Sequence, residues 1–178
     1  MTEKYIILDR DGVINYESSE YIKKPNEWNP IPGSLEAIKI LTENSFKIIV
    51  ITNQSGINRG IISYDNFVMI NLKMNEAVDK SGGEIHSLLY SPHTPFEKSS
   101  TRKPECGMFL HAAQRYNFDL SKTYAVGDSP RDIEAAISAK CKPLAVRTGN
   151  GHEIERNNLY KVKMFDDLRA SVDYIISK

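Results

Sequence analysis

The sequence has few cysteines, no excess of charge and no long hydrophobic run. Its 178 residues include two cysteines, Cys106 and Cys141, which are too few for the disulfide framework of a small secreted domain. Lysine plus arginine and aspartate plus glutamate both number 23, so the formal net charge is zero. A nucleic-acid-binding protein would favour a clustered basic excess, and we therefore predict no nucleic-acid partner.

The absence of long apolar segments argues against a membrane protein. No run approaches the roughly 20 apolar residues of a membrane-spanning helix. The first apolar segment, residues 5–8, is too short for the core of a signal peptide. We therefore predict a cytoplasmic monomer with reduced thiols and no membrane partner. The length fits one domain that spans residues 1–178.

Short apolar runs alternate with stretches of helical periodicity along the chain. The apolar runs predict strands at residues 5–8, 46–52, 85–90, 123–127 and 143–146. The periodic stretches predict helices near residues 32–41, 67–77, 108–116, 129–137 and 168–175. This order is typical of an α/β fold with a doubly wound parallel sheet. The two long irregular stretches, a flap at 12–31 and a substrate loop at 91–107, are candidates for function.

Acidic residues follow two of the predicted strands. Asp9 and Asp11 come after the first strand, and Asp128 and Asp132 come after the fourth. In folds of this class ligands bind at the carboxyl ends of the strands. Repulsion between neighbouring carboxylates is relieved by a cation, and three oxygen ligands with room for water and phosphate suit Mg²⁺. The alternatives are an acidic turn after the first strand and acids that complement a helix dipole after the fourth.

Polar and basic residues at two further places suit a phosphate group. Thr52, Asn53, Gln54 and Ser55 follow the second strand, where hydroxyl, amide and backbone N–H groups can bind phosphate oxygens. A turn or helix cap would explain them as well. Lys103 in the second irregular stretch supplies a positive charge for a phosphoryl group, although a solvated surface lysine is the simpler interpretation of that residue alone.

The order of these motifs resembles the haloacid dehalogenase (HAD) superfamily of phosphohydrolases. Within it, the residues of these motifs resemble those of the branch of heptose-bisphosphate and histidinol phosphatases. The match runs from about residue 5 to the C-terminus. The segments that carry the resemblance are LDRDGVIN (8–15), ITNQSGI (51–57), RKPECGM (102–108), GDSPRD (127–132) and VRTGNG (146–151). No insertion large enough for a cap domain separates these segments.

The resemblance implies a mechanism and a role for each motif. Asp9 would be the nucleophile that forms an aspartyl-phosphate, and Asp11 would be the general acid and base. Mg²⁺ would be held by Asp9, by the backbone carbonyl of Asp11 and by Asp128. Thr52 and Lys103 would bind the transferring phosphoryl group. Asp132 would orient these residues rather than bind the metal.

The chain departs from the family at a zinc loop. Most members of the branch carry a C-x-H…C-x-C pattern directly before the Arg-Lys pair. The four ligand positions correspond here to Ser91, His93, Ser99 and Thr101. Structural zinc needs four thiolate or imidazole ligands, so we predict no zinc, and Cys106 lies on the wrong side of the Arg-Lys pair to replace a lost ligand.

The implied substrate is a phosphorylated sugar. The resemblance favours removal of the 7-phosphate of D-glycero-D-manno-heptose 1,7-bisphosphate, in the context of lipopolysaccharide or another surface glycan. Arg59 and Arg102 would bind a second phosphate, whereas Ser129 stands where the heptose enzymes often have a lysine. Histidinol phosphate and a nucleic-acid 3′-phosphate are the alternative substrates. A phospho-receiver domain or an inactive scaffold is the non-enzyme alternative, but Thr52 stands at the second strand end and every catalytic position is filled.

Overall fold

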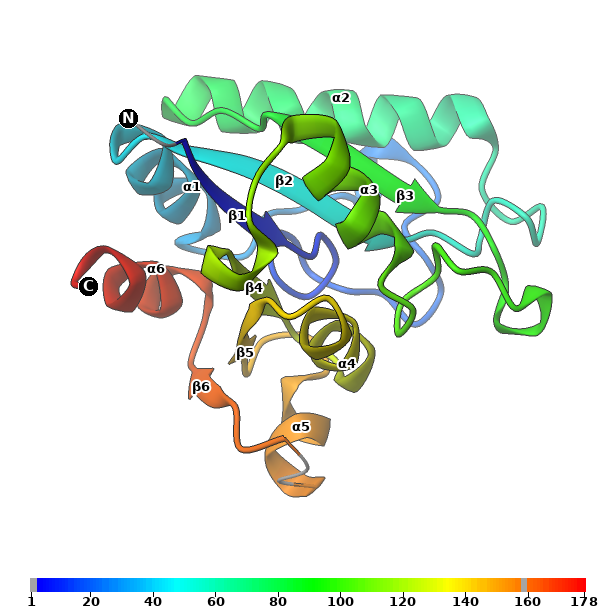
Figure 1. Cartoon of the computed structure of the whole chain (residues 1–178). Coiled ribbons are helices and arrows are strands. Elements are labelled where there is room, and N and C mark those ends of the chain that lie inside the picture. Colours follow the sequence, from blue (N-terminus) through cyan, green and yellow to red (C-terminus); the bar gives the residue numbers. More distant parts are fainter. Residues whose placement is uncertain (1–2, 158–159) are drawn as a thin grey trace.

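The computed structural model describes residues 3–157 and 160–178, and a six-stranded parallel sheet forms its centre (Figure 1). The strands are β1 (Lys4–Leu8), β2 (Phe46–Asn53), β3 (Ser87–Ser91), β4 (Tyr124–Gly127), β5 (Lys142–Val146) and β6 (Lys163–Phe165). Their order in the sheet is β3-β2-β1-β4-β5-β6, and every neighbouring pair is parallel. The predicted doubly wound α/β class, without a large cap domain, is confirmed.

Six α-helices and three short 3₁₀ turns lie between or after the strands in the described residues. They are α1 (Ser34–Glu43), α2 (Tyr64–Ser81), α3 (Gly107–Tyr116), α4 (Pro130–Ser138), α5 (Gly151–Asn157) and α6 (Leu168–Ile176), with η1 (Pro25–Glu27), η2 (Pro95–Glu97) and η3 (Leu120–Lys122). The sequence analysis missed α5 and β6. Both are too short to establish a period, and β6 is an edge strand of only three residues.

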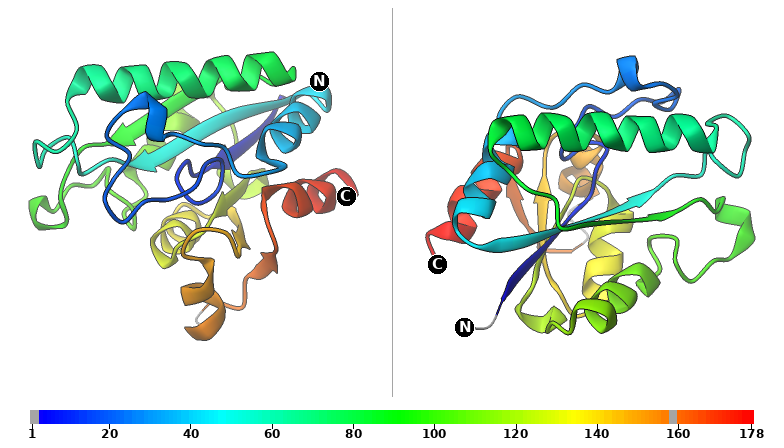
Figure 2. Two further views of the ribbon diagram at one scale, coloured as in Figure 1. Left: turned by 180° about the vertical axis from the view of Figure 1, so that it is seen from behind. Right: turned by 90° about the horizontal axis from the view of Figure 1, so that it is seen from above.

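Helices cover both faces of the sheet, as the two views of Figure 2 show. Successive side chains of a strand point to opposite faces. In β1, Ile6 and Leu8 therefore join a core with α1, α2 and α6, while Tyr5 and Ile7 join a second core with α3 and α4. All four side chains are at least nine-tenths buried. This burial on both faces explains why the strands are apolar runs rather than alternating ones.

The flap forms part of the first core and is tied to α2. Its Trp28 is 1% exposed, and the Nζ atom of Lys73 on α2 donates hydrogen bonds to the carbonyls of Pro25 and Trp28 at 2.8 and 2.7 Å. The ammonium group also lies 5.8 Å from the centre of the Trp28 ring. These contacts fix one end of the flap and leave residues 15–22 beside the carboxyl ends of the strands.

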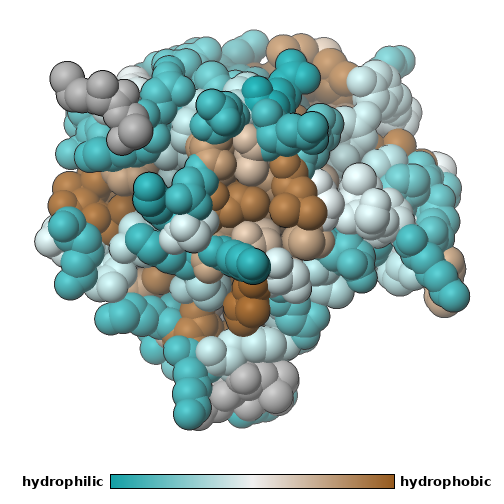
Figure 3. All heavy atoms as spheres, in the orientation of Figure 1, coloured by the Kyte–Doolittle hydropathy of each residue, from teal (hydrophilic) through white to brown (hydrophobic). Residues whose placement is uncertain are grey.

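No helix in the described part of the chain is both long enough and apolar enough to cross a bilayer. Figure 3 shows that apolar side chains on the face seen in Figure 1 lie in patches that hydrophilic side chains interrupt.

Candidate active site

Three carboxylates converge where β1 and β4 end. Asp9 directly follows β1 and Asp128 directly follows β4, and these two strands are hydrogen-bonded neighbours. Asp132 lies in the first turn of α4. One oxygen of each lies within 4.8 Å of the others, and within residues 3–157 and 160–178 this is the only cluster of potential metal ligands of that kind. The switch point between β1 and β4 is where doubly wound folds bind their ligands.

Lys103 lies between two of these acids and is buried. Its Nζ atom is 2.8 Å from an oxygen of Asp9, 2.6 Å from an oxygen of Asp132 and 2.9 Å from the carbonyl of Ile51. Lys103 is 3% exposed. Burial alone would lower its pKa, but the two carboxylates raise that pKa above its ordinary value, so the ammonium group is charged.

The same cluster shifts the pKa of the acids in different directions. Burial, and then the charge of Asp132, raises the pKa of Asp9 to about 7, although Lys103 opposes the shift. Burial would also raise the pKa of Asp132, but its ion pair with Lys103 holds it below its ordinary value. Burial and the charges of Asp132 and Asp9 raise the pKa of Asp128. The raised pKa values show that the negative charges of Asp9 and Asp128, when both are ionised, are not balanced by Lys103 alone.

Two glycines leave room for the carboxylate of Asp128. A Cβ atom on Gly12 or on Gly149 would clash with the Asp128 carboxylate, and both glycines have positive φ angles, +84° and +61°. The carboxylate accepts one hydrogen bond, 2.8 Å from the backbone N–H of Asn150. With Asp9 it offers hard oxygen ligands at unbalanced negative charge, and this donor set fits Mg²⁺.

Asp11 points away from the three-carboxylate cluster and is held by donors. Its carboxylate accepts hydrogen bonds from the Arg10 guanidinium at 2.9–3.1 Å, from the Asn15 amide at 2.8 Å and from the Gln54 amide at 2.8 Å. Arg10 and Asn15 are at most 1% exposed, so these partners fix the orientation of the carboxylate. The Asp11 side chain is 22% exposed and lines the cavity above Asp9.

The side chains of residues 52–55 make different contacts. The Thr52 hydroxyl is 1% exposed and accepts a hydrogen bond from Gln54 at 3.0 Å. Gln54 therefore bridges Thr52 and Asp11 with the same amide nitrogen. The Asn53 side chain exchanges two hydrogen bonds with the backbone of Lys103, at 2.9 and 3.0 Å. Ser55 lines a neighbouring cavity.

Ser129 begins α4 rather than facing open space. Its backbone N–H and hydroxyl both donate to the same oxygen of Asp132, at 3.0 and 2.7 Å, which forms a capping box with Pro130 at the first helical position. The Ser129 side chain is 5% exposed. Its hydroxyl orients Asp132, which in turn orients Lys103.

Hydroxyl groups lie together at three of the four positions where the family resemblance places zinc ligands. The Ser99 and Thr101 hydroxyls are 2.8 Å apart, and Thr101 donates to the hydroxyl of Ser91 at 3.3 Å. His93 instead lies with its Nδ1 atom 3.4 Å from Glu97. The hydroxyls thus form a small hydrogen-bonded cluster at the base of the loop.

Glu97 anchors the tip of this loop. Its carboxylate accepts hydrogen bonds from the Thr94 backbone N–H and from the Asn58 amide, the latter at 2.9 Å. These donors, Thr94 first, lower the pKa of Glu97 to about 2.

We expect the anchor at Glu97 to survive moderate acid. A carboxyl whose pKa is depressed in the folded state stabilises that state above its unfolded pKa of about 4.5, and the contribution is lost as the pH falls towards 2. The chemical shift of the Thr94 amide proton, followed by NMR, should therefore titrate well below pH 4. A midpoint near 4.5 would contradict the anchor, and Glu97→Gln should remove the titration.

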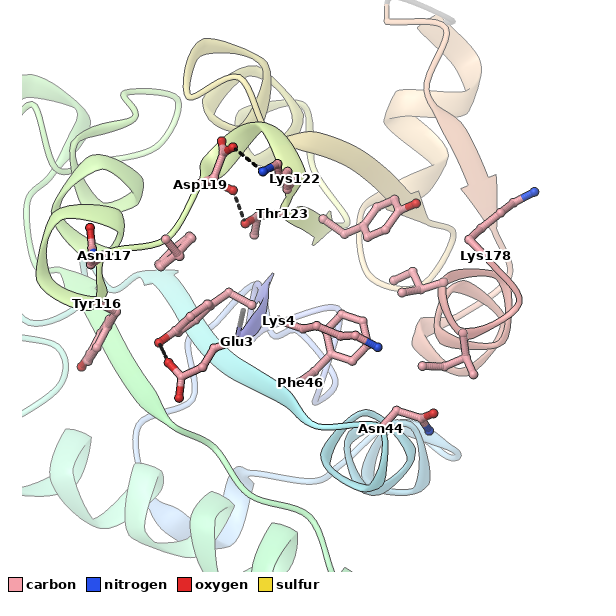
Figure 4. Close-up of a pocket in the computed structure, with 15 residues that line it drawn as sticks. Glu3, Lys4, Asn44, Phe46, Tyr116, Asn117, Asp119, Lys122, Thr123 and Lys178 are labelled. Atoms are coloured by element: carbon pink, nitrogen blue, oxygen red, sulfur yellow. Dashed lines mark hydrogen bonds and ion pairs between the residues drawn. The ribbon is translucent and has the colours of Figure 1, made fainter. Parts of the chain in front are cut away.

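Three cavities lie at this edge of the sheet, one of them about 560 Å³ and lined by Arg102, Lys103 and Arg131, and another lies at the opposite edge. The catalytic cavity, about 60 Å³, contains Asp9, Thr52, Lys103 and Asp128, and a cavity of about 330 Å³ beside it shares Asp11 with it. A cavity of about 700 Å³ lies where the strands begin, around Lys4, Phe46 and Lys178 in Figure 4. None of the predicted site residues lines it.

Several residues at the site had no role in the sequence analysis. Arg10 and Asn15 hold Asp11, and both belong to LDRDGVIN, but such residues are common at surfaces. Asn150 acts through its backbone N–H, which no sequence pattern reveals. Glu17 and Arg131 line the catalytic cavity. Arg131 lies inside GDSPRD, so its position next to Asp132 was the available signal.

Comparisons with known proteins agree with this geometry. A family model described as HAD-hydrolase-like matches residues 100–171. The D-glycero-β-D-manno-heptose-1,7-bisphosphate 7-phosphatase of Bordetella bronchiseptica is 44% identical over 177 residues, which cover 98% of this chain and 99% of that protein. The Pseudomonas aeruginosa protein of the same name is 42% identical over 171 residues, with 96% of each chain covered.

Solved structures give the same result. The crystal structure of D,D-heptose 1,7-bisphosphate phosphatase from Bordetella bronchiseptica, complexed with magnesium and phosphate, matches with a TM-score of 0.95 at 39% identity over 98% of each chain. The Burkholderia thailandensis enzyme matches with a TM-score of 0.78 at 35% identity over 98% of this chain and 99% of that one. The fold and the site define a HAD-like hydrolase that acts as a phosphatase. Within that class, the chain belongs to the D-glycero-β-D-manno-heptose-1,7-bisphosphate 7-phosphatase family.

Proposed function

We propose that this enzyme removes the 7-phosphate of D-glycero-D-manno-heptose 1,7-bisphosphate. The observation that carries the proposal is the convergence of Asp9 and Asp128 at adjacent strand ends, with Lys103 bridging Asp9 and Asp132. The names of the relatives supply the sugar. The whole chain, 1–178, would act as one catalytic domain.

The chemistry assigns one role to each carboxylate. Asp9 attacks the phosphorus atom, the P–O bond to the sugar breaks, and an aspartyl-phosphate forms. Asp11 protonates the departing sugar oxygen. It then takes a proton from the water that attacks the aspartyl-phosphate, so that Asp9 and inorganic phosphate are released. Arg10, Asn15 and Gln54 orient Asp11 for both steps.

Mg²⁺ would be held by Asp9, the backbone carbonyl of Asp11 and Asp128. When bound, it offsets the repulsion between these carboxylates and the phosphate dianion. The support is the unbalanced charge of Asp9 and Asp128 and the presence of magnesium with phosphate in the matching Bordetella enzyme. Asp132 is engaged by Lys103 and Ser129, so we assign it to positioning.

The phosphoryl group and the second phosphate would use different residues. Lys103 and Thr52 line the catalytic cavity and would bind the transferring phosphoryl oxygens. Arg59 and Arg102 line the larger cavity with Ser55 and would bind the second phosphate of the substrate. Asn53, Gln54 and Ser129, which the sequence analysis placed near the substrate, are now proposed to position catalytic groups. Their side chains form hydrogen bonds to the backbone of Lys103, to Asp11 and to Asp132, respectively.

Four further properties belong to the same proposal. The hydroxyl cluster of Ser91, Ser99 and Thr101 would order the loop without zinc, and near-equimolar zinc in the purified protein would contradict this. The enzyme would act in the cytoplasm, because both cysteines are free thiols. It would have no nucleic-acid partner, because its formal net charge is zero. It would act as a monomer.

The first test is phosphate release from the heptose 1,7-bisphosphate with Mg²⁺, measured beside histidinol phosphate. We expect turnover of the bisphosphate and a loss of more than about 10⁴-fold in Asp9→Asn, since that variant lacks the nucleophile. Asp119→Asn, an exposed carboxylate at the opposite edge of the sheet, is the matched control and should retain full activity. Preferential turnover of histidinol phosphate would reject the sugar and leave the phosphatase chemistry in place.

A further inference from the structure

Arg10 is a buried cation whose guanidinium group has partners on two sides. Its side chain is 1% exposed. The Nε and Nη2 atoms donate to the Asp11 carboxylate at 2.9–3.1 Å, and the Nη1 atom donates to the Oδ1 atom of Asn71 at 3.2 Å. A buried donor needs such partners, because its lost hydration is otherwise not compensated. Among the described residues, Asp11 supplies the only carboxylate within ion-pair distance of Arg10, and Asn71 holds the remaining nitrogen atom.

The Asn71 side chain can present only its oxygen atom to Arg10. Asn71 lies on α2, and its Nδ2 atom donates to the carbonyl of Phe67, one turn earlier in the same helix, at 2.9 Å. A flipped amide would lose that hydrogen bond. It would also point its NH2 group at a guanidinium group, which accepts no hydrogen bond. Asn71 is therefore an acceptor of fixed orientation.

The helix that carries Asn71 is itself fixed against β1. Ile70 and Met74 of α2 are buried in the same core as Leu8, the last residue of β1. Lys73 of α2 holds the flap through the carbonyls of Pro25 and Trp28. The core thus fixes α2 relative to the segment that carries Arg10 and Asp11, and Asn71 cannot move away from Arg10 without moving the helix.

We propose that Asn71 is a positioning residue for the acid–base catalyst: it fixes the plane of the Arg10 guanidinium group and thereby the direction of the Asp11 carboxylate. This inference rests on the proposed function, in which Asp11 transfers the protons. Without Asn71, the guanidinium group turns towards another acceptor, and the carboxylate that it holds at two points turns with it. Asn15 and Gln54 still donate to Asp11, so the loss is partial. Proton transfer responds to such a change because donor and acceptor must lie within hydrogen-bond reach.

The test is Asn71→Leu, a substitution of similar size that removes the acceptor. For the heptose 1,7-bisphosphate with Mg²⁺, kcat should fall about 10-fold, below the roughly 100-fold that a displacement of about 1 Å can cost, and KM should stay unchanged. Asn75→Leu, the same exchange one turn further along α2 at an exposed position, is the matched control and should leave kcat unchanged. Urea unfolding of both variants shows whether the fold is retained.

A second substrate, p-nitrophenyl phosphate, separates positioning of Asp11 from a general disturbance of the site. Its leaving group departs without a proton, so the rate constant of the first burst of nitrophenol should be the same in Asn71→Leu as in wild type. The steady-state rate that follows should fall about 10-fold, because the attack of water on the aspartyl-phosphate still needs Asp11 as the base. The variant should therefore show a normal burst followed by slow turnover.

A double-mutant cycle shows whether Asn71 acts through Arg10. In an Arg10→Met background, adding Asn71→Leu should cause no further fall in kcat, because the contact that it removes is already absent. A further fall of about 10-fold would overturn the inference. If Arg10→Met does not fold, the burst measurement on Asn71→Leu decides alone.

The remaining outcomes are equally decisive. Unchanged kcat in Asn71→Leu, a raised KM for the bisphosphate, or an equal fall in the burst and the steady-state rate would each overturn the role of Asn71 and leave the proposed function standing. If wild-type enzyme hydrolyses p-nitrophenyl phosphate but not the bisphosphate, the proposed sugar substrate fails. The burst measurement then still tests Asn71, because it does not use the sugar.

Discussion

Replacing Lys103 by methionine should lower the free energy of unfolding by about 3–5 kcal/mol and remove nearly all phosphatase activity. The ammonium group is buried and contacts Asp9 and Asp132 at 2.8 and 2.6 Å. Without it, two buried carboxylates lose their only cation and repel each other and Asp128. Activity falls because the same charge would bind the transferring phosphoryl group. Urea unfolding, followed by circular dichroism, measures the first effect, and phosphate release measures the second.

A second substitution separates stability from catalysis at Lys103. Adding Asp132→Asn to Lys103→Met removes one of the two stranded charges and should recover part of the lost stability without restoring activity. Lys122→Met is the matched control, because that lysine is 82% exposed and its ion pair with Asp119 should contribute little. A loss below about 1 kcal/mol in Lys103→Met would show that the buried ion pairs do not stabilise the fold.

Asp128→Asn should act in opposite directions on the metal-free and the Mg²⁺-bound protein. Without Mg²⁺ the substitution removes a buried charge that has one hydrogen-bond donor and no cationic side chain within ion-pair distance among the described residues. The free energy of unfolding should then rise, on the order of 1 kcal/mol. With Mg²⁺ at about 100 times its Kd, the wild-type protein should gain about 2.7 kcal/mol and the variant almost nothing.

Thermal unfolding with and without Mg²⁺ measures both effects of Asp128→Asn. For a chain of this length, each kcal/mol should shift Tm by about 2–4 °C. Activity should be lost even though the metal-free variant is the more stable protein, as expected where an active site holds repelling charges. Asp166→Asn, at 86% side-chain exposure, is the control. A Mg²⁺ response in Asp128→Asn equal to that of wild type would show that Asp128 is not a metal ligand.

The sequence could predict which residues meet but not all of the ways in which they are held. Parallel strands bring their carboxyl ends to one edge, so Asp9 and Asp128 had to lie close together once the strands were recognised. The pairing of β1 with β4, whose partner residues are 118 positions apart in the chain, depends on tertiary packing that no local pattern contains. The helix start at Ser129 and Pro130 was predictable because capping is a local property.

The contacts that hold the site residues in place could not be predicted from the sequence, for physical reasons. Asn53 was assigned to a phosphate, yet its amide exchanges hydrogen bonds with the backbone of Lys103. That contact joins residues 50 positions apart. The space that Gly12 and Gly149 leave for Asp128 depends on the approach of two loops, and a glycine in a sequence does not say what approaches it. Local sequence patterns therefore identify the catalytic residues more readily than the residues that support them.

The hydrogen bonds between Asn53 and the backbone of Lys103 make the position of this lysine independent of the loop that precedes it. Because the backbone at Lys103 is fixed to the end of β2 by two hydrogen bonds, the length and composition of residues 92–101 can vary without moving the ammonium group. Insertions or deletions in that segment would then alter which substrates fit while the reaction itself is unchanged. The enzyme can in this way acquire new substrates by exchanging a short surface segment.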